Sequence, residues 1–134
     1  MEQTANASQS KHNISVSMSL PNMLLRLEGL TVFIGAIALY ASQGFSGLAF
    51  LALILVPDVS KVGYKVNNRV GSWAYDAAHV YTLPTLLMGL GVVLHTPVAI
   101  QIGLIWCTHI GMDRVMGFGL KYPTEFKDTH LQRV

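Results

Sequence analysis

Two pairs of aspartate and histidine residues have the spacing that places them together on a helix surface. His109 and Asp113 are four residues apart, and Asp76 and His79 are three apart, so each pair shares one helix face. Imidazole and carboxylate groups are ligands for zinc, manganese, iron or magnesium. A bound metal would activate a water molecule or polarise a carbonyl or phosphoryl oxygen. Without a metal, the same groups can act as general acid and base.

These polar residues lie in or beside long apolar segments. Of the 134 residues, 51% are hydrophobic and only 12% are charged, and the mean hydropathy is +0.45. Soluble domains have about 25% charged residues. We therefore expect an all-α integral membrane protein, because a soluble bundle would need charged outer helix faces that are missing here. The net charge of +2 and the lack of a basic stripe exclude a nucleic-acid-binding role.

The apolar segments predict a four-helix transmembrane bundle within residues 21–116. The expected spans are residues 21–41, 45–57, 73–94 and 98–116. The second span is short for the roughly 20 residues that cross a bilayer, so it either re-enters the membrane or continues past a kink at Pro57. Pro84 is expected to kink the third span near Val80. A disordered polar leader (1–20), a polar connector (58–72) and a polar tail (117–134) complete the predicted organisation.

The distribution of charge predicts the orientation of this bundle. With four spans, both termini and the connector lie on one side of the membrane, together with all nine lysines and arginines. The positive-inside rule makes that side cytoplasmic, so both termini are predicted to be cytoplasmic. Aromatic residues near this interface are expected to form a membrane-interface belt rather than to contact a substrate; they are Tyr64, Trp73, Tyr75 and Tyr81.

Polar residues from every span fall at similar depths, which predicts one cytoplasm-facing pocket. At about 1.5 Å per residue, Glu28, His79 and His109 lie roughly 9–10 Å inside their spans. The expected catalytic residues are His79, His109, Asp76, Asp113 and Glu28. The expected ligands of a divalent metal are Asp76, His79, His109 and Asp113, with Asp58 at the rim as a weaker candidate. Arg26 or Arg114 would bind an anionic substrate group or balance the carboxylates.

Three classes of function fit such a pocket. The first is an enzyme, either a hydrolase or an acid–base isomerase or cyclase, that acts on a lipid-like or apolar small molecule from the bilayer. The second is a proton-coupled transporter, which would need a homo-oligomer because four spans lack the paired repeats of transporters. The third is a structural subunit of a membrane complex, in which the ion pairs lock the bundle. Ionisable residues inside membranes are usually functional, which favours a functional pocket.

Several stretches resemble a family of small integral membrane proteins called domain of unknown function 4260. They include Leu25-Arg26-Leu27-Glu28-Gly29, Pro57-Asp58, Tyr75-Asp76-Ala77-Ala78-His79 and the run from His109 to Leu131. The resemblance covers about residues 24–131 and implies no particular reaction. It implies that the tail belongs to the domain, and this adds Asp128 and His130 as weaker metal-ligand candidates.

Overall fold

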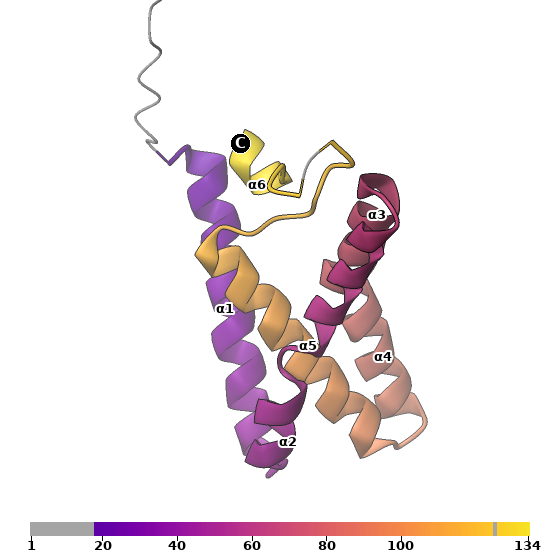
Figure 1. The fold of residues 1–134 in the computed structure, drawn as a ribbon. Helices are drawn as coiled ribbons and strands as arrows, with labels where there is room; N and C mark the ends of the chain where they lie inside the picture. The colour runs from indigo at the N-terminus through magenta and orange to yellow at the C-terminus, as the bar shows by residue number, and fades with distance from the viewer. Residues whose placement is uncertain (1–17, 125) are drawn as a thin grey trace, which may run out of the picture.

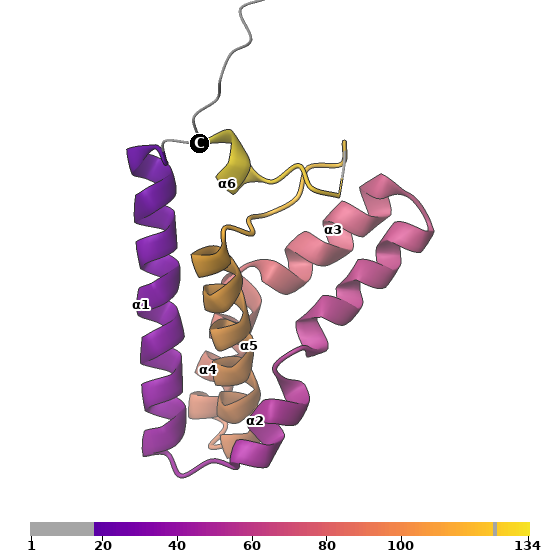
Figure 2. The same ribbon diagram turned by 60° about the vertical axis from the view of Figure 1, so that its left-hand side comes forward.

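The computed structural model describes residues 18–124 and 126–134, so most of the predicted leader lies outside the described residues. Within these ranges the chain is all-helical without a strand, which confirms the all-α part of the predicted fold class (Figure 1). The elements are α1 (Leu20–Ser42), α2 (Gly47–Leu53), the 3₁₀ helix η1 (Val56–Lys65), α3 (Asn68–His79), α4 (Thr82–Val93), α5 (Pro97–Met116) and α6 (His130–Arg133). Helix α5 packs between α1 and α4, and η1 packs along α3 (Figures 1 and 2).

Helices α1 and α5 approach closely because each has a glycine at their contact. A Cβ atom built on Gly111 would lie 2.7 Å from the carbonyl oxygen of Gly29 and 2.8 Å from the amide nitrogen of Phe33. Both neighbours are backbone atoms, which cannot move aside as a flexible side chain could. Small residues at helix contacts let backbones pack this tightly, as is common between helices in membranes.

The predicted third span is two helices instead of one. Helix α3 ends at His79, Val80 has extended backbone angles (φ −97°, ψ 142°), and α4 begins at Thr82. Pro84 has no N–H group to donate to the carbonyl of Val80, so a continuous helix would lack a hydrogen bond at this point. The chain therefore changes direction at the position where Pro84 predicts a kink. The helix does not merely bend there but ends, and a new helix begins.

The region around Pro57 also differs from the simplest prediction. The chain continues past Pro57 as η1, so of the two alternatives for the second apolar segment the structure contains the continuing helix. The segment predicted as a polar connector, residues 58–72, is largely helical, because it includes most of η1 and the first turn of α3. This difference matters for function, since η1 carries Asp58.

Two helical stretches are long and apolar enough to span a membrane, Leu20–Ser42 and Gly47–Lys65. In their most apolar windows only 17% and 0% of the residues are buried inside the protein. The core helix of a soluble protein would be mostly buried, whereas these helices direct apolar side chains outward. The predicted four-span bundle and the cytoplasmic location of its termini stay predictions.

The two ends of the described chain lie at the same end of the molecule (Figures 1 and 2). The start of α1 lies near α6, and the side-chain amide of Asn22 donates a hydrogen bond to the Leu131 carbonyl oxygen at 2.5 Å. The α1–α2 and α4–α5 connections lie at the opposite end (Figure 2). This arrangement agrees with the predicted positions of the termini relative to the two short turns.

Candidate metal site

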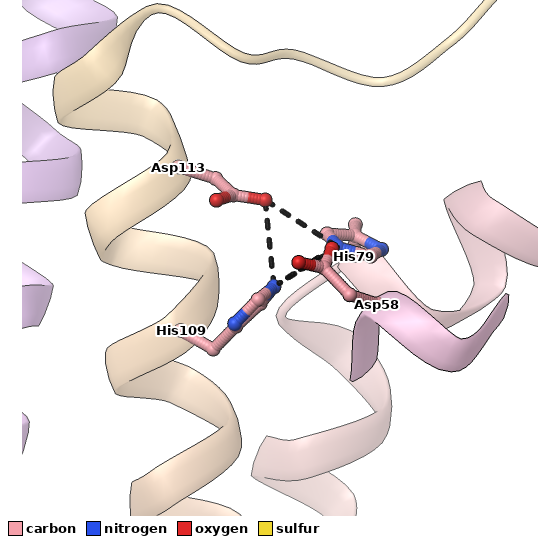
Figure 3. Close-up of side chains that lie close together, drawn as sticks. All are labelled: Asp58, His79, His109 and Asp113. Carbon is pink, nitrogen blue, oxygen red and sulfur yellow. Dashed lines mark hydrogen bonds and ion pairs between the residues drawn. The ribbon is translucent and has the colours of Figure 1, made fainter. Parts of the chain in front are cut away.

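Four side chains from three helices converge at one point (Figure 3). His109 and Asp113 come from α5, His79 is the last residue of α3, and Asp58 comes from η1. The Nε2 atoms of the two histidines are 3.2 Å apart. Asp58 Oδ1 lies 3.5 Å from each Nε2, and Asp113 Oδ2 lies 3.4 and 3.5 Å from them. All four atoms lie within 4.8 Å of one another.

These distances fit a tetrahedral metal ion better than they fit direct ion pairs. Zinc bound to nitrogen and oxygen at about 2.0–2.1 Å places its tetrahedral ligands about 3.3–3.4 Å apart. The five separations given above run from 3.2 to 3.5 Å. Charge-assisted hydrogen bonds between imidazolium and carboxylate would be shorter, at about 2.7–2.9 Å. The spacing therefore leaves room for a cation at the centre of the four atoms.

A hydrogen bond from Nδ1 of each histidine to a backbone carbonyl oxygen directs Nε2 toward the centre of the group. His79 Nδ1 lies 2.8 Å from the carbonyl oxygen of Tyr75, and His109 Nδ1 lies 2.7 Å from that of Ile54. A carbonyl oxygen can only accept, so both Nδ1 atoms carry the hydrogen. In the neutral rings both Nε2 lone pairs then point at the same space as the two carboxylate oxygens. Histidine ligands of metals are commonly oriented by such a backbone acceptor.

Asp58 supplies a further indication that a cation belongs at this point. Its Oδ1 atom is buried, and within the described part of the chain it has no hydrogen-bond donor. The ammonium group of Lys61 is 2.9 Å away but does not approach in hydrogen-bond geometry. A buried carboxylate oxygen without a donor costs free energy unless a positive charge compensates it. Lys61 offsets part of this negative charge, and a metal shared with the two histidines would add a second positive charge at the oxygen that lacks a donor.

The break after α3 positions His79, and Arg114 stabilises the break. The guanidinium group of Arg114 donates to the carbonyl oxygen of His79 at 2.8 Å and to that of Phe118 at 2.7 Å. The imidazole ring of His79 stacks on Tyr75 with ring centroids 3.7 Å apart. Tyr75 in turn donates its hydroxyl hydrogen to Asp113 Oδ2 at 3.3 Å. These contacts fix the positions of two of the four ligands, His79 and Asp113.

The structure brings together three of the four main predicted ligands and one weaker candidate. Asp58, and not the predicted Asp76, is the fourth residue of the group. Glu28 is exposed on α1, outside the group. The two arginines make structural contacts, since Arg26 donates to Asn22 Oδ1 and to the Val115 carbonyl oxygen, while Arg114 bridges helix ends. The proposed substrate-binding role of these arginines stays a prediction.

Tyr75 corrects the predicted aromatic belt. Its side chain is only 2% exposed, and it supports the ligand group instead of facing the membrane interface. The sequence carries a signal for this role, because Tyr75 is four residues before His79 and so lies under it on the same helix face. Trp73, by contrast, is 60% exposed, as a residue of an interfacial belt would be.

The tail folds over the end of the bundle and holds the other predicted ligands away from the group. Asp76 Oδ1 accepts a hydrogen bond from the backbone amide of Lys121 at 2.6 Å. His130 Nδ1 accepts one from the Leu120 amide at 2.7 Å. Asp128 pairs with Arg133 and accepts from Thr124. Asp76 thus attaches the tail to α3, whereas His130 and Asp128 make their hydrogen bonds within the tail.

Replacing Asp76 by alanine is expected to release the tail without loss of metal. The variant removes the acceptor for the Lys121 amide, whereas Asp76→Asn keeps a carbonyl oxygen in nearly the same position. We expect faster proteolytic cleavage of the tail in Asp76→Ala, wild-type cleavage in Asp76→Asn, and wild-type metal content in both. Loss of metal in Asp76→Asn would mean that Asp76 is a ligand.

Acidification below about pH 6.5 is expected to loosen the tail through His130. Burial lowers the pKa of His130, and the charge of Arg114 lowers it further. Since the folded pKa lies below the unfolded value of about 6.5, protonation favours the unfolded tail, and this stability is present above that pH and lost below it. Hydrogen bonds from Arg133 and Thr124 hold the pKa of Asp128 at about 2, so that pair persists through this range.

The measurement is hydrogen exchange at the Leu120 amide, corrected for the intrinsic effect of pH on exchange. We expect protection to fall between pH 7.5 and 5.5 in the wild type. His130→Asn provides the control, because an asparagine oxygen can accept the same hydrogen bond but does not ionise. Equal pH dependence in both proteins would assign the loosening to another group.

Comparison with known proteins gives one match. The sequence model of a family described as domain of unknown function (DUF4260) matches residues 22–134. No match was found among curated proteins or among solved structures. All four converging residues lie within the matched range.

Proposed function

This chain belongs to the DUF4260 family, a domain of unknown function, and we propose that it is a membrane-embedded hydrolase that depends on a divalent metal. The observation that carries the proposal is the convergence of two imidazole nitrogens and two carboxylate oxygens, with the two nitrogens 3.2 Å apart and each nitrogen 3.4–3.5 Å from both oxygens. Zinc is the metal that best fits this geometry and this ligand set. The two outward-facing apolar helices support placement in a bilayer.

The four ligands differ in how firmly they are held, and this difference favours catalysis over a purely structural ion. The side chains of His79 and His109 are fully buried, and that of Asp113 is 8% exposed. The side chain of Asp58 is 31% exposed, although its Oδ1 atom, which faces the other ligands, is buried. Structural zinc sites have four fixed protein ligands, whereas catalytic sites have three and an open position. We infer that His79, His109 and Asp113 hold the ion and that Asp58 yields its position to water.

In that arrangement Asp58 would serve as the general base. A metal supplies a water molecule of lowered pKa and polarises the substrate carbonyl. The Asp58 carboxylate takes one proton from water as the water oxygen bonds to the carbonyl carbon. The bond from that carbon to the leaving oxygen then breaks, and the same proton passes to the leaving oxygen. The products are a carboxylic acid and an alcohol, and Asp58 is regenerated as a carboxylate.

The test is hydrolysis of p-nitrophenyl acetate by the zinc-loaded protein in nanodiscs, with Asp58→Asn as the key variant. The amide cannot accept the proton, and general acid–base catalysis typically contributes about 10²–10⁴-fold to a rate. We therefore expect turnover to fall by at least about a hundredfold while one zinc ion stays bound. Asp128→Asn, which removes a tail carboxylate, serves as the matched control and is expected to retain activity.

Two outcomes would contradict this function. Wild-type turnover that survives complete removal of zinc would show that the metal is not required. If the wild-type protein binds zinc but hydrolyses the ester no faster than Asp58→Asn, the ion would be structural. The protein would then fit the third predicted class, a structural subunit of a membrane complex.

A further inference from the structure

An apolar cavity lies beside the candidate metal site, between η1, α3 and α5. Its volume is about 420 Å³. The lining residues are almost all apolar: Leu53, Val56, Pro57, Ser60, Ala78, Ile102, Ile105 and Trp106. The two polar groups among them are already used, since the Ser60 hydroxyl donates to the Pro57 carbonyl oxygen at 2.7 Å and the Trp106 indole donates to that of Ala78 at 2.6 Å.

The cavity walls and the metal ligands are neighbours in the chain. Pro57 directly precedes Asp58, and Ala78 directly precedes His79. Ile105 lies one helical turn before His109 on the same face of α5. Each of the three elements that supply ligands, η1, α3 and α5, therefore also supplies cavity wall, so the cavity and the ligand group are built on the same three elements.

The chemistry of the walls selects an apolar occupant. A polar group or an ordered water placed among these side chains would lose its hydrogen bonds to bulk water without replacing them. An alkyl chain has no hydrogen-bonding groups, so it can occupy the cavity without this cost. At the ligand end, the ammonium group of Lys61 lies 2.9 Å from Asp58 and is 41% exposed. It offers a positive charge next to Asp58 for an anionic group of a bound molecule.

We propose that this cavity binds the alkyl chain of a single-chain acyl substrate, with the acyl carbonyl at the metal and the carboxylate product paired with Lys61. The inference rests on the proposed function and specifies its substrate class. One cavity beside the ligands accommodates one chain, so a lysolipid-like ester or another long-chain monoacyl ester fits better than a two-chain phospholipid. The product would be a fatty acid.

Trp106 provides a direct probe of the occupant, because it lines the cavity. The chain has two tryptophans, and Trp73→Phe removes the exposed one and leaves Trp106 as the sole indole emitter. The probe is 11-bromoundecanoate, whose bromine quenches indole fluorescence on contact. In nanodiscs of saturated phosphatidylcholine we expect saturable quenching of Trp106, which unbrominated undecanoate reverses.

Two variants each place a phenylalanine ring in the cavity, one from α3 and one from η1. Ala78→Phe acts from α3, and Ser60→Phe acts from η1. Each is expected to weaken binding by at least about tenfold, the effect of losing about two buried methylene groups. The matched control, Ala38→Phe, adds the same ring to an exposed site on α1 and is expected to leave binding unchanged.

The outcomes separate this inference from the metal proposal, because zinc content is measured on the same samples. Quenching that does not saturate, or that is equal in filled and control variants, would overturn the chain-binding site even if zinc is bound. Saturable quenching without zinc would leave the cavity assignment intact and overturn the metal proposal. Saturable, cavity-dependent quenching by brominated phosphatidylcholine would overturn the single-chain assignment.

Discussion

Replacing His109 by alanine is expected to abolish the stabilisation of this protein by zinc. An ion that binds only the folded state stabilises it by about 2.7 kcal/mol at a free concentration one hundred times the dissociation constant. His109 is fully buried and directs Nε2 at the proposed ion. Loss of groups that merely orient a ligand already weakens metal binding by about 10–100-fold, so loss of a ligand is expected to exceed about a hundredfold.

The measurement is thermal unfolding of the purified protein in detergent, with and without zinc. His109→Ala also leaves the Ile54 carbonyl oxygen without its donor, so its unfolding temperature is expected to fall even without metal. The informative quantity is therefore the shift caused by zinc in each protein. His95→Asn is the control, because His95 lies in the α4–α5 turn with φ 54°, a conformation that asparagine tolerates. An undiminished zinc shift in His109→Ala would remove His109 from the site.

Leucine in place of Gly111 is expected to disrupt the packing of α1 on α5. Even a Cβ atom at this position would lie within 2.8 Å of two backbone atoms of α1. Overpacking of a tight contact typically costs about 1–3 kcal/mol, and a leucine against backbone exceeds what local adjustment can absorb. Gly111 also lies two residues from both His109 and Asp113. Separation of the helices should therefore weaken metal binding together with stability.

Gly35→Leu offers a matched control on the same helix pair. A Cβ atom at Gly35 meets no atom within 4 Å, so the same substitution adds no clash there. Helix propensity favours leucine over glycine by somewhat less than about 1 kcal/mol, which predicts an unchanged or slightly raised unfolding temperature. Equal destabilisation of the two variants, or none in Gly111→Leu, would contradict the close α1–α5 contact.

The sequence predicted the part of the site that depends on one helix. His109 and Asp113 are neighbours because the helical repeat places residues four apart on one face. The depth of a residue along a span could also be predicted from the sequence, and it placed His79 and His109 at the same level. Both inferences use only the rise and the repeat of a helix, but the contact between His79 and His109 depends in addition on how α3 and α5 are arranged.

The direction in which a residue points from its helix could not be predicted in the same way. Glu28 has the expected depth, but its neighbour Gly29 faces α5, and successive helix residues differ by about 100° in direction. Glu28 is therefore exposed. Asp76 shares a helix face with His79, yet it accepts a hydrogen bond from the tail. Asp58 reaches the site because η1 packs along α3, a contact with no local sequence signal.

The most direct test of the metal site is the metal content of the protein as purified, measured by elemental mass spectrometry. The double variant His79→Ala/His109→Ala serves as the blank, and its helical content is checked by circular dichroism. We predict about one equivalent of zinc per chain in the wild type and a background level in the blank. Wild-type protein that contains no more metal than the blank, both as purified and after dialysis against zinc, would contradict the account.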